Sequence, residues 1–314
     1  MRSLLLSLLL PLAGLHAAFY VAPNGSDANP GTEAKPFATL SRARDAVRTL
    51  RQAPQNKPVV VLLKGGIYEL SEPLALGLED SGTAESPTIF QAAPGEQPLV
   101  SGGRVIKGWR KEGGAYVVDL PEAKAGTWYP HQLFVRQPRQ TWFERRYRPS
   151  RGLLVIGGLT DAPHRNPTGR INHRNPQDEF IYRGDDIKAF ANLDDVEAIA
   201  LHDWSSGRLH IREIDAENKV VKFKTFPHYR IGHWYEGGRN PYLLENLKEE
   251  YGKPGQWYLD RPTGRLSYTP LPGEDLTKCT VVAPRIERLV TITGDAEGEH
   301  FVEHVQFRGI TFGH

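Results

Sequence analysis

The sequence predicts a mostly β protein in which short parallel strands stack as the coils of a β-helix and an antiparallel β domain interrupts the stack. Two observations lead to this fold class. Short aliphatic and β-branched runs follow one another after turns of Gly, Pro and Asn without helices between them, which argues against β-α-β units. The middle of the chain instead alternates apolar with polar residues and is rich in Trp, Tyr, His and Arg, which is typical of antiparallel strands.

The N-terminus has the three parts of a secretory signal peptide. Arg2 supplies a positive charge, Leu4–Leu12 is an apolar run, and the small residues Ala17 and Ala18 follow. The run is about half of the roughly 20 apolar residues that a membrane-spanning helix needs. We therefore expect residues 1–18 to be removed, the mature protein to be secreted or periplasmic, and no membrane attachment after cleavage.

Charge and cysteine content exclude several classes of protein. Lys and Arg number 39 against 37 Asp and Glu, and no long basic run occurs, so nucleic acid is not an expected partner. The arginine cluster between Arg145 and Arg151 is expected to be a solvated turn. Cys279 is the only cysteine, which excludes a disulfide within the chain and CxxC zinc sites. No HExxH motif occurs, and we expect neither a metal nor another cofactor.

Residues 19–103 are expected to hold the N-terminal cap and the first coils of the β-helix. Apolar residues recur at helical spacing over residues 40–50, with Thr39 or Ser41 as the N-cap, so one helix is expected there. A stack of strands leaves an apolar, unpaired end, which this helix can cover. The expected strands are short runs, of which the continuous apolar run at 59–63 is typical of a strand buried on both faces. In chain order they are residues 59–63, 67–70, 73–76, 88–92 and 99–100.

Residues 104–283 are predicted to form the inserted antiparallel domain. Its expected elements are a strand, two strand pairs joined by turns, and one short helix. In chain order these are residues 196–201, 209–211 with 220–223, 243–251, and 257–260 with 265–269. The last pair flanks Arg261-Pro262-Thr263-Gly264, which is a strong β-hairpin signal.

The first pattern returns over residues 284–314, with strands expected at 289–292 and 305–312. We expect these strands to stack in parallel beside those at 59–63 and 88–92. A stack of repeats needs about three units and a terminal cap to bury its core. Because His314 falls within a coil, the chain is expected to be a truncated part of a longer protein.

Segments along the whole mature chain resemble a known family. The opening Tyr20–Thr32 and the segment Pro36–Leu40 resemble the start of many pectate-lyase-like parallel β-helix proteins. More specific segments follow in order: Val100–Arg104 with Gly108-Trp109, Asn192–Glu197, His202–Leu209, Gly255–Asp260 and Val305–Phe312. Together they are similar to glycoside hydrolase family 141, including its characteristic insertion domain. The resemblance implies a right-handed parallel β-helix that hydrolyses plant cell-wall polysaccharide, with fucosidase and xylanase activities known in the family.

The catalytic residues stay unknown at this point. Glycoside hydrolysis needs two carboxyl groups, about 5 Å apart for retention or about 6.5–9.5 Å apart for inversion. The adjacent pairs Asp185-Asp186, Asp194-Asp195 and Glu249-Glu250 are expected to be structural, because neighbours on a strand point to opposite faces. The resemblance instead implies catalytic carboxylates on later coils, beyond His314.

The best candidates for substrate binding combine polar and aromatic side chains. His202, Asp203, Trp204 and Arg208 lie close together in the sequence with His210, and His233 with Trp234 belong to a second patch. His, Asp and Arg can hydrogen-bond sugar hydroxyls, and Trp can stack on a sugar face. A core position for Trp204 and a local ion pair for Arg208 are the alternatives that the sequence leaves open.

Three functions fit the sequence, each with a polysaccharide or oligosaccharide as partner. They are an exported glycoside hydrolase, a non-catalytic glycan-binding β-helix or adhesin, and a polysaccharide lyase, which usually needs a basic residue and often calcium. The fold does not decide among them, and the family-specific segments favour the first. We expect the longer parent protein to be the enzyme and this chain to be inactive alone.

Overall fold

The computed structural model describes residues 18–160, 178–202, 205–225, 227, 231 and 240–314. The described part is mostly β, as predicted from the sequence. The chain divides into two compact units, which we call the first unit (Met1–Val105 with Val282–His314) and the second unit (Ile106–Val281). No helix in the described ranges is long and apolar enough to cross a membrane.

The described part of the first unit contains one long helix, α1 (Leu40–Arg51), where the sequence predicts it. Thr39 is the N-cap, and its side chain accepts a hydrogen bond from the backbone N–H of Arg42 at 3.1 Å. Asp27 fixes the backbone at the start of the helix, because its carboxylate accepts hydrogen bonds from the backbone N–H groups of Ala38 and Thr39 at 2.8 and 2.9 Å. The loop before the helix therefore works as a capping structure.

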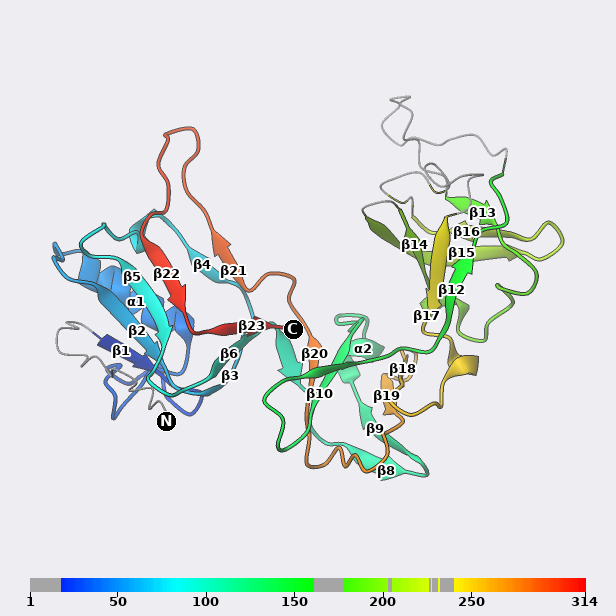
Figure 1. Cartoon of the computed structure of the whole chain (residues 1–314), viewed down its shortest axis with the longest axis horizontal. Coiled ribbons are helices and arrows are strands. Elements are labelled where there is room, and N and C mark those ends of the chain that lie inside the picture. Colours follow the sequence, from blue (N-terminus) through cyan, green and yellow to red (C-terminus); the bar gives the residue numbers. More distant parts are fainter. Residues whose placement is uncertain (1–17, 161–177, 203–204, 226, 228–230, 232–239) are drawn as a thin grey trace, which may run out of the picture. The chain divides into compact units, whose positions relative to one another are not determined.

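Three sheets of the first unit contain only parallel strand pairs (Figure 1). The first sheet has the order β1 (Ala18–Val21), β2 (Val59–Leu63), β5 (Thr88–Ala92) and β22 (Val305–Arg308). The second has the order β3 (Gly66–Glu69), β6 (Pro98–Ser101) and β23 (Thr311–Gly313). The third pairs β4 (Leu74–Leu76) with β21 (Val290–Ile292). In addition, β7 (Gly103–Val105) pairs antiparallel with the end of β20 (Thr280–Pro284).

The parallel pairs join chain segments from both sides of the second unit. β5 pairs with β22 in register Thr88↔Val305, and β6 pairs with β23. This agrees with the expectation that the segments before and after the insertion stack in parallel. Val290–Ile292 differs in detail, because it lies beside β4 rather than beside β2 or β5.

The centre of the first unit is apolar on both faces of β2. Val59, Val61 and Leu63 belong to the main core with α1, while Val60 and Leu62 pack in a second cluster. All five residues are buried, as the continuous apolar run predicts.

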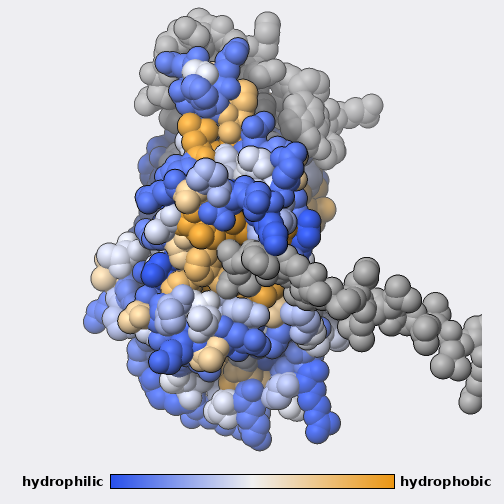
Figure 2. Space-filling model, turned by 90° about the vertical axis from the view of Figure 1, so that its left-hand side faces the viewer, coloured by the Kyte–Doolittle hydropathy of each residue, from blue (hydrophilic) through white to orange (hydrophobic). Residues whose placement is uncertain are grey.

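Apolar side chains also remain exposed in the first unit, where β21, β22 and β23 each end their sheet within the described residues. Ile292, Phe301 and Phe312 are 58%, 64% and 38% exposed. Figure 2 shows hydrophobic residues gathered in a band, with hydrophilic ones on both sides, on the face that it displays. Unpaired strand edges beside exposed apolar side chains favour association with further strands.

The second unit is antiparallel and contains a six-stranded sheet (Figure 1). Its order is β12 (Ser150–Val155), β17 (Pro241–Glu245), β14 (Glu197–Leu201), β15 (Ser206–Asp215), β16 (Val220–Phe223) and β13 (Glu179–Ile181). A second sheet has the order β18 (Trp257–Asp260), β19 (Arg265–Tyr268), β9 (Ala115–Asp119) and β8 (Arg110–Glu112). The short elements are α2 (Pro121–Lys124), β10 (Leu133–Arg136) and β11 (Glu144–Arg146).

Both predicted strand pairs of the second unit form as expected. β15 pairs with β16, and β18 forms a hairpin with β19 in register Asp260↔Arg265. Gly264 closes this hairpin with a φ of +74°, and an added Cβ would lie 2.5 Å from the Leu120 carbonyl oxygen. Glycine is therefore required at this turn.

The helix predicted at residues 243–251 is wrong. Residues 241–245 form β17, and only Lys248–Glu250 makes a single 3₁₀ turn. Tyr242 and Leu244 are buried at alternate positions because β17 lies between β12 and β14. Pairing on both sides outweighs the helix preference of a stretch rich in Leu, Glu and Lys.

Candidate functional site

The most concentrated group of charged side chains lies on one face of the six-stranded sheet. Glu197 on β14 stands directly opposite Glu245 on β17 and opposite His210 on β15. The alternate residues Ala198, Leu209 and Leu244 belong to the buried core of the second unit. Because side chains alternate along a strand, the two glutamates and His210 project from the opposite, polar face.

Two arginines bind the carboxylate of Glu197. Arg148 donates from Nη1 to Glu197 Oε2 at 2.5 Å, and both side chains are buried. Arg208 on β15 donates from its Nη1 to the same Oε2 and to Glu245 Oε2, the latter at 3.1 Å. Arg208 therefore links the two glutamates.

Two histidines approach the other oxygen of Glu197. His131 Nδ1 lies 3.1 Å from Glu197 Oε1, and His210 Nε2 lies 3.5 Å from it. Tyr129 completes the group, since its hydroxyl accepts from Arg148 Nη2 at 3.0 Å. We call these seven residues the Glu197 cluster: Tyr129, His131, Arg148, Glu197, Arg208, His210 and Glu245.

The pKa values follow from burial and these contacts. Burial alone would raise the pKa of Glu197, but His131, Arg148 and Arg208 outweigh it and lower the pKa to about 2. Burial lowers the pKa of His210, against the opposing effect of Glu197. Burial also raises the pKa of Tyr129 to about 12. At neutral pH the cluster thus contains an ionised Glu197, a neutral His210 and a neutral phenol.

This arrangement suits binding better than two-carboxyl hydrolysis. The Glu197 side chain is fully buried, and an ionised carboxylate cannot donate a proton to a leaving group. His131, Arg208 and His210 are instead partly exposed, at 41%, 33% and 40% of their side chains. Glu197 therefore positions three side chains that can hydrogen-bond a ligand from the solvent side.

The adjacent carboxylates that the sequence singles out make structural contacts. Asp195 is 5% exposed and accepts from Arg261 Nε at 2.5 Å. Asp194 lies 3.0 Å from Lys224 Nζ, and Glu250 accepts from Arg151 Nε at 3.2 Å. In the ranges that the structure describes, no group of three or more His, Cys, Asp or Glu side chains is placed to hold a metal ion.

The structure describes three of the candidate binding residues, His202, Arg208 and His210. It brings Arg208 and His210 together at Glu197 and leaves His202 apart from them. Arg208 belongs to the Glu197 cluster, which realises the local ion pair that the sequence left open. His202 follows the last residue of β14 and is 9% exposed, and its backbone N–H donates to the Ser205 carbonyl at 2.8 Å. Continued alternation puts His202 on the side of Ala200, away from Arg208. The other four lie outside the described residues: Asp203, Trp204, His233 and Trp234.

Glu197, His131 and Arg148 are absent from the candidates predicted from the sequence. Glu197 has a local signal, because it is a charged residue in a strand that is otherwise Ala, Ile and Leu. His131 and Arg148 have none, since tertiary packing brings them to the sheet. The expected solvated arginine turn is also wrong, because Arg146 and Arg148 are only 4% and 6% exposed and are held by buried carboxylates.

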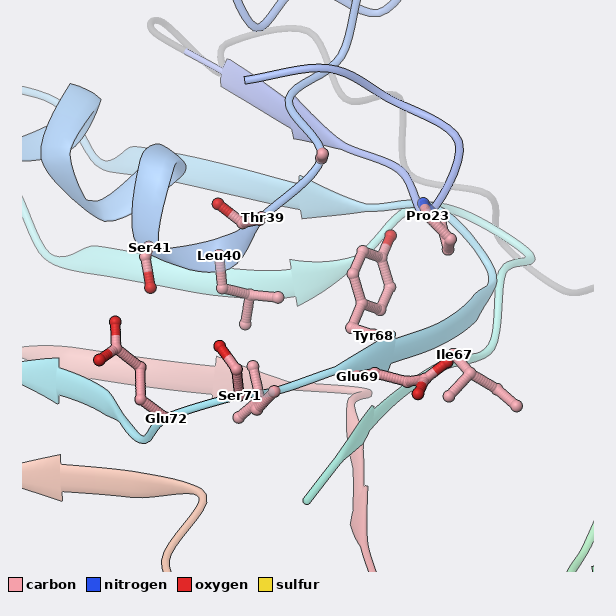
Figure 3. Close-up of a pocket in the computed structure, with 11 residues that line it drawn as sticks. Pro23, Thr39, Leu40, Ser41, Ile67, Tyr68, Glu69, Ser71 and Glu72 are labelled. Atoms are coloured by element: carbon pink, nitrogen blue, oxygen red, sulfur yellow. The ribbon is translucent and has the colours of Figure 1, made fainter. Parts of the chain in front are cut away.

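A cleft of about 500 Å³ in the first unit is explained by the packing of the backbone and needs no ligand. Figure 3 shows Ser71 and Glu72 pointing toward the first turn of α1, while the ring of Tyr68 rises from β3. The Tyr68 hydroxyl donates toward the Val21 and Lys64 carbonyls, and Glu69 accepts from the backbone N–H of Val105 at 3.0 Å. These polar groups hold the backbone of the unit, so the cleft follows from the packing of α1.

Comparison with known proteins shows the fold. No family model matches the chain. A solved structure described as a glycoside hydrolase is similar with a TM-score of 0.72 and 24% identity, covering 95% of this chain and 50% of that one. The complex structure of XylC with xylose is more distant, with a TM-score of 0.37, 16% identity and coverage of 92% and 34%.

One curated relative matches part of the chain. The uncharacterized protein YwoF of Bacillus subtilis (strain 168) is 34% identical over 83 residues, which are 26% of this chain and 15% of YwoF. The chain thus spans about half the length of the glycoside hydrolase and a smaller share of YwoF. The chain has the fold of a glycoside hydrolase structure over nearly its whole length.

Proposed function

We propose that this chain is the N-terminal portion of an exported glycoside hydrolase, similar to family 141, that acts on plant-type cell-wall polysaccharide with fucosidase-like or xylanase-like activity. One observation carries the proposal. The likeness to a glycoside hydrolase covers 95% of the chain and therefore includes the inserted second unit as well as the first. An insertion shared in this way is a more specific feature than parallel strands alone.

The proposal includes a right-handed parallel β-helix for the first unit. The order of the strands supports it: β2, β3 and β4 contribute in turn to the three parallel sheets, and β5, β6 and β21 follow in the same order. β22 and β23 then begin another round. Connections between parallel strands of one sheet are almost always right-handed.

The proposal assigns glycan binding, and not bond cleavage, to the Glu197 cluster. Glu197 is buried, ionised and held by two arginines, and Glu245 shares Arg208 with it. The catalytic carboxylate pair of the parent enzyme is therefore placed outside this cluster, on further coils of the β-helix. Exposed His131, Arg208 and His210 are the groups that would contact sugar hydroxyls.

Hydrolysis assays test the proposal. Residues 19–314 and the longer protein that contains them are incubated with fucosylated pectic oligosaccharides and with xylan, and released sugars are measured. We expect turnover by the longer protein only. Robust turnover by residues 19–314 alone would contradict the assignment of the catalytic carboxylates to further coils, and its loss in His202→Ala, with folding unchanged, would move the active site into the second unit. Binding of these glycans by the longer protein without cleavage supports the adhesin alternative instead.

Export is tested separately by intact-mass measurement of the protein recovered from the periplasm or medium. The signal-peptide pattern predicts an N-terminus close to Phe19. Recovery of a membrane-bound product that retains Met1 contradicts this part of the proposal.

A further inference from the structure

A second cleft lies in the second unit, beside β11. It has a volume of about 420 Å³, within the range of about 300–1,000 Å³ that is common for small-molecule sites. Its lining combines an exposed aromatic residue, charged side chains and short apolar ones. The lining residues are Glu144, Arg145, Arg146, Tyr147, Pro254, Gly255 and Leu271.

Tyr147 presents its ring to the solvent from a fixed backbone. It is 70% exposed, although Arg146 and Arg148 on either side are buried. The Tyr147 N–H donates to the Gly255 carbonyl at 3.2 Å, and the Tyr147 carbonyl accepts from the Trp257 N–H at 3.0 Å. An exposed aromatic ring on a rigid support offers a flat apolar face at a low cost in conformational entropy.

Some charged side chains in the cleft already have partners, and one remains available to a ligand. Arg146 is occupied, because it donates to Glu144 at 2.9 Å, to Glu274 at 2.8 Å and to the Tyr268 hydroxyl at 2.8 Å. The hydrogen bond from Arg146 also lowers the pKa of Glu144, so that carboxylate stays ionised and paired. Arg145 is exposed and pairs with no carboxylate among the residues that the structure describes. The charge that remains is therefore the single positive charge of Arg145.

We propose that this cleft binds an acidic oligosaccharide, with a uronate carboxylate on Arg145 and a sugar ring stacked on Tyr147. A guanidinium can make two parallel N–H···O bonds to a carboxylate, which gives orientation as well as affinity. Arg145 and Tyr147 are two residues apart and line the same cleft. The inference rests on the proposed function for the choice of a glycan, and it adds the chemical class of the sugar.

Other occupants fit the cleft less well. Nucleic acid binding draws on many phosphate contacts, whereas the cleft offers one unpaired cation. An apolar peptide would have to cover the Glu144–Arg146 ion pair, and desolvation of charged groups is costly. A uronate-containing sugar matches both the free cation and the aromatic face.

Calorimetric titration of the complete chain tests the inference. The ligands are a galacturonate trimer and the neutral galactose trimer, in buffer with EDTA so that no bound calcium bridges the carboxylates. We expect the acidic trimer to bind about tenfold or more tightly than the neutral one, and only its affinity to fall with added salt. Arg145→Gln should remove this preference, and Tyr147→Ala should weaken binding of both trimers.

Matched controls come from the first unit. Arg288→Gln removes an exposed arginine and Phe301→Ala removes an aromatic residue that is 64% exposed, and neither should change binding. Because all four positions are exposed, circular dichroism should show unchanged folding in every variant.

Several results overturn the inference: equal binding of the two trimers, no binding at millimolar ligand, or Arg145→Gln with the affinity of the unmodified chain. Hydrolysis by the longer protein without binding at this cleft leaves the proposed function standing and removes only the inference. Binding as expected, with no hydrolysis by the longer protein, contradicts the proposed hydrolase function and leaves the inference standing.

Discussion

The two units of this chain bury very different side chains. Within the described residues, the first unit buries one charged side chain, Asp80, which accepts from Arg48 at 2.6 Å. Among its described residues, the second unit buries five: Arg146, Arg148, Asp195, Glu197 and Glu274. A parallel strand such as β2 has apolar neighbours on both faces, whereas an antiparallel sheet can leave one face for polar groups. The difference indicates that apolar burial stabilises the first unit, and that the second also depends on the protonation of its buried groups.

The tryptophans allow the two units to be followed separately. All six tryptophans lie between Ile106 and Val281, so tryptophan fluorescence reports on the second unit alone. Hydrogen exchange read from peptides of residues 18–105 reports on the first unit.

The largest effect is expected for Glu197→Gln. The substitution leaves the buried guanidinium of Arg148 without a counter-charge, which destabilises the second unit by about 3–5 kcal/mol. Urea unfolding followed by tryptophan fluorescence measures this loss. Glu245→Gln is the matched control, because Glu245 is not fully buried and its partner Arg208 keeps Glu197 as a counter-charge, so a smaller loss is expected. Equal effects of the two substitutions would falsify the importance of the buried pair.

Acid should destabilise the second unit selectively. The pKa of Glu197 is lowered from 4.5 to about 2, so its contribution is complete above about pH 4.5 and is lost as the pH falls toward 2. The lowered pKa of His210 acts in the same direction, because protonation in the unfolded chain opposes folding as the pH falls. A lowering from 4.5 to about 2 corresponds to about 3 kcal/mol.

The measurement compares fluorescence-detected unfolding at pH 7 with unfolding at several values down to pH 2. The unmodified chain should lose stability across this range, and Glu197→Gln should lose much less. An identical pH dependence in the two proteins removes Glu197 as the cause.

A smaller and pH-independent effect is expected for Val61→Ala in the first unit. Val61 is fully buried in the middle of β2, and the loss of two methyl groups with the resulting cavity costs about 2 kcal/mol. Hydrogen exchange of the first-unit strands should become faster than in the unmodified chain, by the same factor at pH 5 and at pH 7. Tryptophan fluorescence should show an unchanged transition, and a shift there contradicts the independence of the two units.

The smallest effect concerns the start of α1. Thr39→Ala removes the side-chain acceptor for the Arg42 N–H, and a lost N-cap costs about 1 kcal/mol. Ser41→Ala is the control within the same turn, because the structure assigns the cap to Thr39. Exchange protection over residues 40–51 should fall in Thr39→Ala and stay unchanged in Ser41→Ala. Equal loss in both variants means that the cap is shared.

Much of the local structure could be predicted from periodicity and turn residues. The apolar run Val59–Leu63, the helix at Leu40 and the turn at Gly264 are local signals, and each forms where the sequence predicts it. The helix predicted at residues 243–251 does not form, because local signals do not decide the structure of this segment. There, the neighbours β12 and β14 decide between strand and helix, and they are distant in sequence.

The Glu197 cluster could be predicted only in part for the same reason. Glu197 faces Glu245 because of the register between β14 and β17, which no local pattern in the sequence encodes. His131 and Arg148 come from segments outside the six-stranded sheet. Asp194 and Asp195 are neighbours in sequence, but they lie in a 3₁₀ turn and bind different partners, Lys224 and Arg261. Register, and not composition, assembles the cluster.

The pairing of β5 with β22 and of β6 with β23 also has a consequence for the order of folding during synthesis. The ribosome releases β5 and β6 well before β22 and β23, and the 176 residues from Ile106 to Val281 emerge in between. The strand pairs of the second unit span shorter distances in sequence than β5–β22 and β6–β23, so the second unit can fold before these two pairs form. Until β22 and β23 emerge, β5 and β6 keep an open edge, which leaves the nascent first unit prone to association with other strands.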